Sequence, residues 1–287
     1  MGVKHSASCQ NGENMAKKND EELYDAAIAM IGSVTKLPAI RVDRDAFLRQ
    51  QFADSEYLDE ILEHGPQHVY TVESLRRKAD GVIRQSTNRT TLAAFVAGIP
   101  GGGAAVAAGS ADVVQYFGFA INLAQKIAYL FGEDDLFSGE SELNEGAKVR
   151  VLAYLGVMLG ASGAAMIVGK LAKEVGKNMG KKITQQALMK TTWYPLLKKV
   201  GAMVGKKVVK ESVGKAVTKA VPVVGGAISG AITYATFKPM GGRLADTLVR
   251  NMNGEFDETG MELRPEFRKA EPLEDGEVTI HAIEIDD

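Results

Sequence analysis

The 287-residue chain contains 34 Lys and Arg residues against 36 Asp and Glu residues, and its single cysteine is Cys9. One cysteine excludes an intramolecular disulfide and favours a reducing compartment. The near-neutral total hides a segregation of charge: residues 1–145 carry 13 basic and 21 acidic residues, residues 146–220 carry 15 basic and 2 acidic, and residues 251–287 carry 3 basic and 12 acidic. The basic middle region predicts an anionic partner surface or an acidic segment of the same chain.

The N-terminal third reads as short amphipathic helices. Residues 1–19 are polar, contain no secretory apolar segment, and are expected to form a disordered leader, with Met15 as an alternative start. Apolar residues at helical spacing predict a helix over 20–36, which Pro38 ends. Cap residues and glycine or proline breaks predict three more helices, over residues 43–52, 54–64 and 69–87. Residues 20–89 form the first part of a single helical domain predicted over residues 20–250.

A helical hairpin over residues 90–136 is predicted at the centre of this domain. Residues 90–111 carry no charge. A proline and three glycines interrupt the hairpin, because proline lacks an N–H group and each glycine costs about 1 kcal/mol inside a helix. The second arm begins near Asp112 and ends at Gly132, before three acidic residues. The hairpin break is therefore assigned to Pro100, Gly101, Gly102 and Gly103.

Residues 149–250 predict helices rich in glycine and lysine. The uncharged runs 151–169 and 220–237 have the length of a membrane span. Their Ala and Gly content suits tightly packed helices of a bundle equally well. Glycines four residues apart predict flat strips where another helix can approach closely. These pairs are Gly156 and Gly160, Gly176 and Gly180, Gly201 and Gly205, and Gly226 and Gly230.

The last helix is expected to end near residues 251–254, since Asn and Gly accept the left-handed cap conformation. Residues 251–287 form an acidic tail, and the alternation over residues 277–285 is compatible with one short strand. The fold class is accordingly all-α: a multi-helix bundle with a Gly-rich central hairpin and Ala/Gly-rich buried helices.

The sequence contains no complete motif for catalysis, metal binding or nucleic-acid binding. The Gly-rich segments lack the residues that a P-loop, a dinucleotide fold or a nucleophile elbow requires. Glu60, His64 and His68 stand four residues apart, but Gly65 and Pro66 break the helix between the histidines, so no metal site is predicted. The basic region lacks the interleaved aromatic residues of a nucleic-acid binder. We therefore expect no catalytic residues, no cofactor and no nucleic-acid partner.

A polar stripe runs along the second arm of the hairpin. At about 100° per residue, its members and Phe119 fall within about 80° of one another. Such a stripe is a solvent-facing surface, a buried network that sets helix register, or a path for a ligand or ion. The candidate binding residues of this stripe are Asp112, Gln115, Asn122 and Lys126.

Lysines of the basic region are the second candidate site. Each lysine near an anionic membrane surface contributes about 1 kcal/mol to binding. The acidic tail is an alternative, internal partner for the same lysines. The candidate contacts are Lys177, Lys181, Lys182, Lys198, Lys199, Lys206 and Lys207.

Four segments give the chain a resemblance to a known family: GIPGG at 98–102, AD at 111–112 with Gln115, LAQKIAYLFG at 123–132, and VPVVGG at 221–226. Over roughly residues 60–250 the chain resembles the EcsC family, named for a protein encoded beside a bacterial ABC transporter. The resemblance implies a mostly helical bacterial protein with no established enzymatic activity and a link to membranes or membrane transport. It provides no catalytic residues to carry over.

Together these observations predict a non-enzymatic protein that is associated with a membrane. In this interpretation it binds peripherally to anionic lipid, or to a membrane transport system, on the cytoplasmic face of the inner membrane. Two alternatives remain open at this stage. One is a soluble carrier that holds an apolar or lipid ligand in its Gly-lined core. The other is a pore-forming or toxin-like protein whose hairpins insert into a membrane.

Overall fold

The computed structural model describes residues 4–87, 111–137, 142–177, 195, 198–206 and 225–256, and side chains within residues 19–87, 116–137, 142–171, 195, 198–206 and 237–256. The described part is 74% helical and contains no strand, which confirms the predicted all-α, multi-helix class. The hairpin break at residues 100–103, the first arm before it and the tail after residue 256 lie outside the described residues.

The N-terminal part contains α1 (Lys4–Val34), α2 (Arg44–Gln51), α3 (Leu58–His64), the 3₁₀ turn η1 (Pro66–His68) and α4 (Val72–Ser86). Two of these helices begin at side-chain caps. The Asp43 carboxylate accepts a hydrogen bond from the Ala46 N–H at 2.8 Å, and the Thr71 hydroxyl accepts one from the Ser74 N–H at 3.2 Å. Helices α2 and α4 therefore begin at local caps, whereas α3 begins at Leu58 without a side-chain cap and later than the predicted residue 54.

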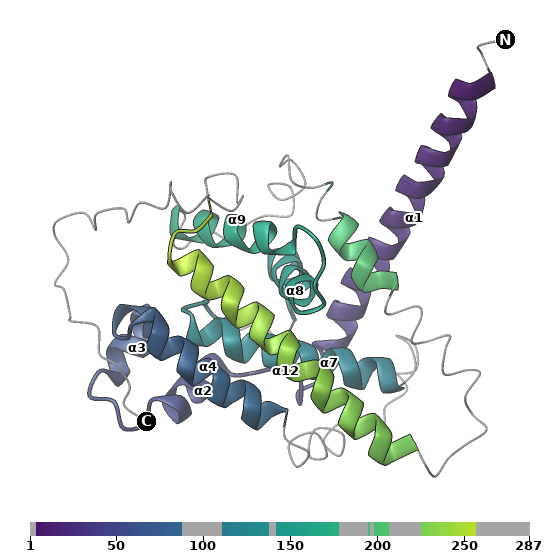
Figure 1. The fold of residues 1–287 in the computed structure, drawn as a ribbon. Coiled ribbons are helices and arrows are strands. Elements are labelled where there is room, and N and C mark those ends of the chain that lie inside the picture. The colour runs from purple at the N-terminus through teal and green to yellow at the C-terminus, as the bar shows by residue number, and fades with distance from the viewer. Residues whose placement is uncertain are drawn as a thin grey trace.

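Helix α1 differs from its prediction at its start. It begins at Lys4, so the helix runs through most of the segment predicted as a disordered leader. Residues 4–19 contain no proline, and Gly12 is the one strongly unfavourable residue for a helix among them. A polar composition therefore does not prevent the helix from continuing there. Figure 1 shows the first half of α1 extending away from the other helices.

Helix α7 (Ala111–Leu130) is the predicted second arm of the hairpin and lies at the centre of the described structure. It packs against α4, α8 and α12, and the latter crosses in front of it in Figure 1. The Phe119 ring meets the Phe237 ring of α12 edge to face, with the ring centroids 4.4 Å apart. The largest fully buried side chains include Phe117, Ile121, Leu123, Ile127, Tyr129 and Phe237.

The C-terminal part contains α8 (Glu145–Met158), α9 (Ala164–Lys177), a short helix over residues 198–206, and α12 (Gly225–Met252). The uncharged run 151–169 is therefore divided between the two helices α8 and α9, with a turn between them. The run 220–237 is described only from Gly225, where α12 begins. No helix in the described part combines the length and the apolar content that a membrane crossing needs.

Three helices end in the same hydrogen-bonded motif. After α7 the Glu133 N–H donates to the Ala128 carbonyl at 3.0 Å, and the Gly132 N–H donates to the Tyr129 carbonyl at 3.3 Å. This is the Schellman pattern, which places a residue with positive φ after the helix and therefore favours glycine. The glycines at this position are Gly132 (φ 87°), Gly160 (φ 75°) and Gly254 (φ 65°).

The glycine strip predicted at Gly201 and Gly205 is confirmed. A Cβ atom on Gly201 would lie 2.5 Å from Cδ2 of Tyr24, and one on Gly205 would lie 2.2 Å from the Leu23 carbonyl oxygen. The absence of Cβ atoms thus lets the helix over residues 198–206 approach the backbone of α1, beside which it lies in Figure 1.

The other glycine pairs have different outcomes. The pair at Gly156 and Gly160 is not a strip, because Gly160 belongs to the turn after α8. Only Gly156 of that pair meets another helix, since its Cβ atom would lie 2.4 Å from Cγ1 of Val200. The packing of the pairs 176/180 and 226/230 lies outside the described side chains.

Candidate functional site

The polar stripe on α7 is partly described. The side chains of Asp112 and Gln115 lie outside the described residues. Asn122 is partly buried, and its side-chain amide donates to the Ile40 carbonyl at 3.2 Å. Phe119 is buried against Phe237. The described half of the stripe thus contains a contact between α7 and the loop before α2, and the choice among the three interpretations stays a prediction.

Lys126 continues the stripe one turn after Asn122. Its side chain is largely withdrawn from solvent, and this burial lowers the pKa of the ammonium group. Within the described part of the chain it forms no ion pair. A cation that is desolvated without a charged partner costs stability. Among the described side chains of α7, Lys126 is therefore a charge whose burial is not compensated by an ion pair.

Gln125 is the polar residue of α7 that the sequence analysis missed. It is 1% exposed and satisfies three backbone groups at once. Its Oε1 atom accepts from the Val42 N–H at 3.0 Å, and its Nε2 atom donates to the carbonyls of Ile40 at 3.0 Å and Ile121 at 3.1 Å. The amide takes the place of a hydrogen-bonding strand for residues 40–42, which run past α7 without secondary structure of their own. The signal that could have found Gln125 is a glutamine among apolar residues on one face of the helix.

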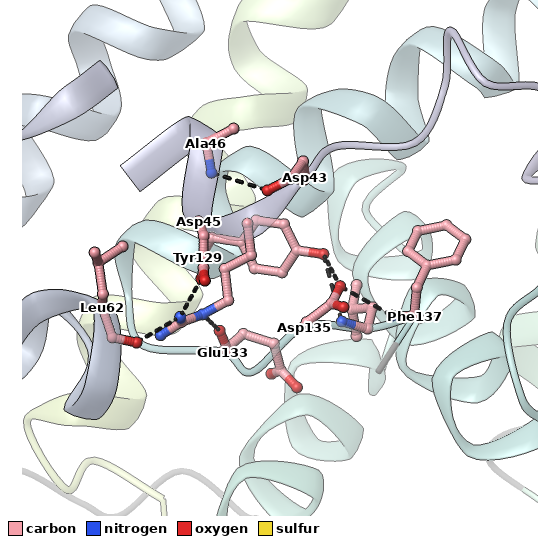
Figure 2. A network of polar contacts seen from close by, with 10 residues as sticks. Asp43, Asp45, Ala46, Leu62, Tyr129, Glu133, Asp135 and Phe137 are labelled. Carbon is pink, nitrogen blue, oxygen red and sulfur yellow. Dashed lines mark hydrogen bonds and ion pairs between the residues drawn. The ribbon is translucent and has the colours of Figure 1, made fainter. Parts of the chain in front are cut away.

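An acidic loop follows α7, and Arg44 connects this loop to α2 and α3. Arg44, which is buried, donates from Nε to the Glu133 carbonyl at 3.1 Å and from Nη1 to the Leu62 carbonyl at 2.9 Å. Nη1 also meets the Asp45 carboxylate at 3.1 Å. Figure 2 shows Leu62, Asp45 and Glu133 arranged around this contact. The guanidinium group therefore joins α2, α3 and the loop.

Tyr129 and Asp135 form the other half of the network in Figure 2. The Tyr129 hydroxyl donates to Oδ1 of Asp135 at 3.5 Å and accepts from the Leu136 N–H at 3.4 Å. The same carboxylate oxygen accepts from the Phe137 N–H at 3.1 Å. Burial, together with the nearby Asp135 charge, raises the pKa of Tyr129 well above its ordinary value. The phenol is therefore a neutral hydrogen-bonding group at physiological pH.

The Glu133 side chain points to α8, where Arg150 and Tyr154 both donate to its carboxylate. The side chains of Glu133 and Arg150 are only 15% and 16% exposed. Burial, and after it the Glu133 charge, raises the pKa of Tyr154. Because a guanidinium and a phenol occupy this carboxylate, it is not poised to act as a general base. Its arrangement is that of a structural tie between the α7 terminus and α8.

The histidines considered as metal ligands lie beside each other at the end of α3. Their ring centroids are 5.6 Å apart, and Nε2 of His64 is 4.0 Å from the Glu60 carboxylate. Gly65, with φ 92°, ends the helix between the two histidines as its sequence predicts. Over the described residues, no group of three His, Cys, Asp or Glu side chains is arranged to hold a metal ion.

The helix over residues 198–206 carries the described part of the second candidate site. Lys198 forms an ion pair with Glu21 of α1 at 2.9 Å, so its ammonium group connects two helices of the fold. The lysines at 177, 181, 182 and 207 lie outside the described side chains. The exposed residues of this helix are Lys199, Met203 and Lys206, which we call the basic face.

The basic face and the glycine strip lie on opposite sides of the same short helix. Residues 199, 203 and 206 follow the i, i+4, i+7 spacing of one helix face. Met203 is 42% exposed, and among the described residues it is the one large hydrophobic side chain that is exposed to solvent. Val200 and Val204 are buried on the other side. The helix thus presents one apolar side chain between two cations.

No model of a known protein family matches the chain, and comparisons with curated proteins and with solved structures find no match either. The resemblance to the EcsC family therefore stays a prediction, and the function is argued from the geometry described above.

Proposed function

We propose that this protein is a non-enzymatic, membrane-associated helical protein that binds anionic lipid peripherally through its basic face. The observation that supports the proposal is the exposed row of Lys199, Met203 and Lys206 on a helix that is packed tightly on its other side. An apolar side chain flanked by cations is the pattern of a helix that lies in the plane of a membrane surface.

The magnitudes indicate how much of the binding this face supplies. Two lysines near an anionic surface contribute about 2 kcal/mol. Insertion of the Met203 side chain adds about 1–2 kcal/mol, because full burial of a methionine is worth about 1.5–3 kcal/mol. The total approaches the roughly 4 kcal/mol that corresponds to a millimolar dissociation constant. Stable attachment therefore requires further lysines of the 146–220 region.

Vesicle flotation tests the proposal directly. The variant Lys199→Glu with Lys206→Glu inverts both charges of the basic face, and Met203→Ser removes its apolar centre. The matched control is Arg49→Glu with Lys238→Glu, which makes the same total charge change at two exposed positions on α2 and α12. Vesicles of phosphatidylcholine with increasing phosphatidylglycerol are the ligand.

We expect the wild type and the control to float with the anionic vesicles and the charge-inverted variant to remain at the bottom of the gradient. Met203→Ser is expected to weaken binding without changing its salt dependence, because it removes no charge. Equal loss in the control would mean that net charge, and not this face, determines binding. Unchanged flotation of the inverted variant would refute the proposal.

Location and partner are part of the same proposal. We place the protein on the cytoplasmic face of a bacterial inner membrane, beside a membrane transport system, as the EcsC resemblance implies. Extraction of native membranes tests the location: release by salt or carbonate supports peripheral binding. A requirement for detergent, or recovery without any membrane, would contradict it.

A further inference from the structure

We infer that residues 257–287 of the same chain dock on the basic face and compete there with anionic lipid. The inference rests on the proposed function for its biological effect, but the contact itself can be tested without lipid. It makes the acidic tail an intramolecular regulator of the lipid-binding surface.

Charge complementarity is the first argument. Residues 257–287 contain 11 acidic and 3 basic residues. Lys199 and Lys206 are exposed and form no ion pair within the described part of the chain, whereas Lys198 on the same helix already binds Glu21. An exposed ion pair contributes only about 0.2–1 kcal/mol, so several acidic residues must act together. The tail has enough of them.

The second argument is the point at which the tail leaves the fold. The Arg250 guanidinium donates to the Glu255 carboxylate at 3.1 Å and lies over the Phe256 ring, 5.2 Å from its centroid. Phe256 is buried, and a Cβ atom on Gly169 would lie 3.0 Å from its Cγ atom. Phe256, the last described residue before residues 257–287, is therefore held against α9.

The helix that carries the basic face packs near the start of α9. Val200 of this helix and Ala164 at the start of α9 both pack on Gly156, at 2.4 and 3.0 Å from the position of its Cβ atom. Gly169 lies five residues further along α9, which is about 7.5 Å along the helix axis. A segment of 31 residues spans at most about 100 Å when it is fully extended. The tail thus has ample length to reach the basic face from Phe256 and to cover it.

The composition of the tail also fits the centre of the face. Its last part, EVTIHAIEI over residues 277–285, alternates apolar side chains with acidic and polar ones. An apolar side chain from this part can cover Met203 while neighbouring carboxylates meet the two lysines. A purely polyacidic segment would leave Met203 exposed, so this segment is the better match.

Zero-length crosslinking of the full chain tests the contact in the absence of lipid. A carbodiimide joins a lysine amine to a carboxylate only when the two groups touch. We expect crosslinked peptides that connect Lys199 or Lys206 to residues 257–287, at a yield independent of protein concentration. Lys199→Arg with Lys206→Arg keeps the charge and is expected to abolish these crosslinks. Absence of the crosslinks, or their formation only between molecules, would overturn the inference.

Flotation of a full-length variant tests the competition. The variant carries Glu277→Gln, Glu284→Gln, Asp286→Asn and Asp287→Asn, so the last part of its tail loses four charges without being removed. We expect vesicle affinity to rise about five-fold or more as these contacts are lost. An unchanged affinity would overturn the competition.

The two experiments separate the inference from the function on which it rests. Crosslinks in a protein that never floats would refute lipid binding and leave the contact standing. Flotation through the basic face without crosslinks, and without a gain in the tail variant, would refute the contact and leave lipid binding standing.

Discussion

Replacement of Gly205 by alanine tests the close approach between α1 and the helix over residues 198–206. The new Cβ atom would lie 2.2 Å from the Leu23 carbonyl oxygen and 2.8 Å from the carbonyl carbon. An ordinary carbon–oxygen contact is about 3.3 Å, so the two backbones must separate by about 1 Å. Overpacking of this kind costs about 1–3 kcal/mol, and backbone atoms cannot rotate away as a side chain does.

The helix propensity of alanine opposes this cost. Alanine is favoured over glycine by about 1 kcal/mol inside a helix. Gly205→Ala is therefore expected to lower the free energy of unfolding by up to about 2 kcal/mol net. Gly81→Ala in α4 is the matched control, because nothing lies within 4 Å of its Cβ position. That control is expected to gain about 0.5–1 kcal/mol.

Urea denaturation followed by circular dichroism measures both variants. Hydrogen exchange of the amides in residues 198–206 shows whether the short helix detaches before the whole chain unfolds. If Gly205→Ala were as stable as Gly81→Ala, with unchanged exchange, the close approach would be refuted.

Three further predictions concern α7 and the loop after it. Gln125→Leu leaves the Val42 N–H and the Ile40 carbonyl without their side-chain partner and is expected to lower the free energy of unfolding in urea by about 2–4 kcal/mol. The control Gln50→Leu changes an exposed residue and is expected to change it by no more than about 0.5 kcal/mol. Equal effects of the two substitutions would contradict the role of Gln125. Because burial lowers the pKa of Lys126, the native state binds this proton less tightly than the unfolded state. Stability of the wild type should therefore rise with pH between the lowered pKa and 10.5, and Lys126→Met should abolish that rise and be the more stable protein at pH 7. A rise of equal size in Lys126→Met would refute this. Glu133→Gln is expected to lower the free energy of unfolding by about 1–3 kcal/mol. Because Tyr154 donates to the Glu133 carboxylate, the loss in the double variant with Tyr154→Phe should be smaller than the sum of the two single losses. Additive losses in this double-mutant cycle would argue against the shared contact.

Much of the fold could be predicted because helix ends are local features. Asp43 marks the start of α2 through a cap that involves a residue only three positions away. Gly132 and Gly254 mark helix ends because each supplies the left-handed residue of a Schellman motif. Gly160 has the same role, but it lies within an uncharged run of 19 residues. Because no charged residue marks a helix end inside this run, its sequence does not show where one helix ends and the next begins. The turn between α8 and α9 was therefore not predicted.

The candidate sites were predicted less well, since their contacts are distant in the sequence. Gln125 meets Val42, which lies 83 residues away, and nothing near Gln125 in the chain indicates that partner. Glu133 reads as part of an acidic stop signal after α7, whereas its carboxylate is bound by Arg150 and Tyr154 of the next helix. For the lysines, composition predicts a basic region but not which side chains point outward. Lys198 pairs with Glu21, while Lys199 next to it is exposed.

The inner and outer faces of the short helix are coupled by geometry, and this coupling separates two explanations of lipid binding. Gly205 holds the helix against α1, and Lys199, Met203 and Lys206 lie on the side away from that contact. If a rigid row of these side chains is required, Gly205→Ala should weaken vesicle flotation although it changes no charge. If the lysines act only through their charge, the same variant should float as the wild type does, because electrostatic attraction to a membrane falls off over a Debye length of about 8 Å and tolerates a shift of about 1 Å. Flotation of Gly205→Ala at a protein concentration where the variant remains folded therefore decides between a shaped binding face and a diffuse attraction.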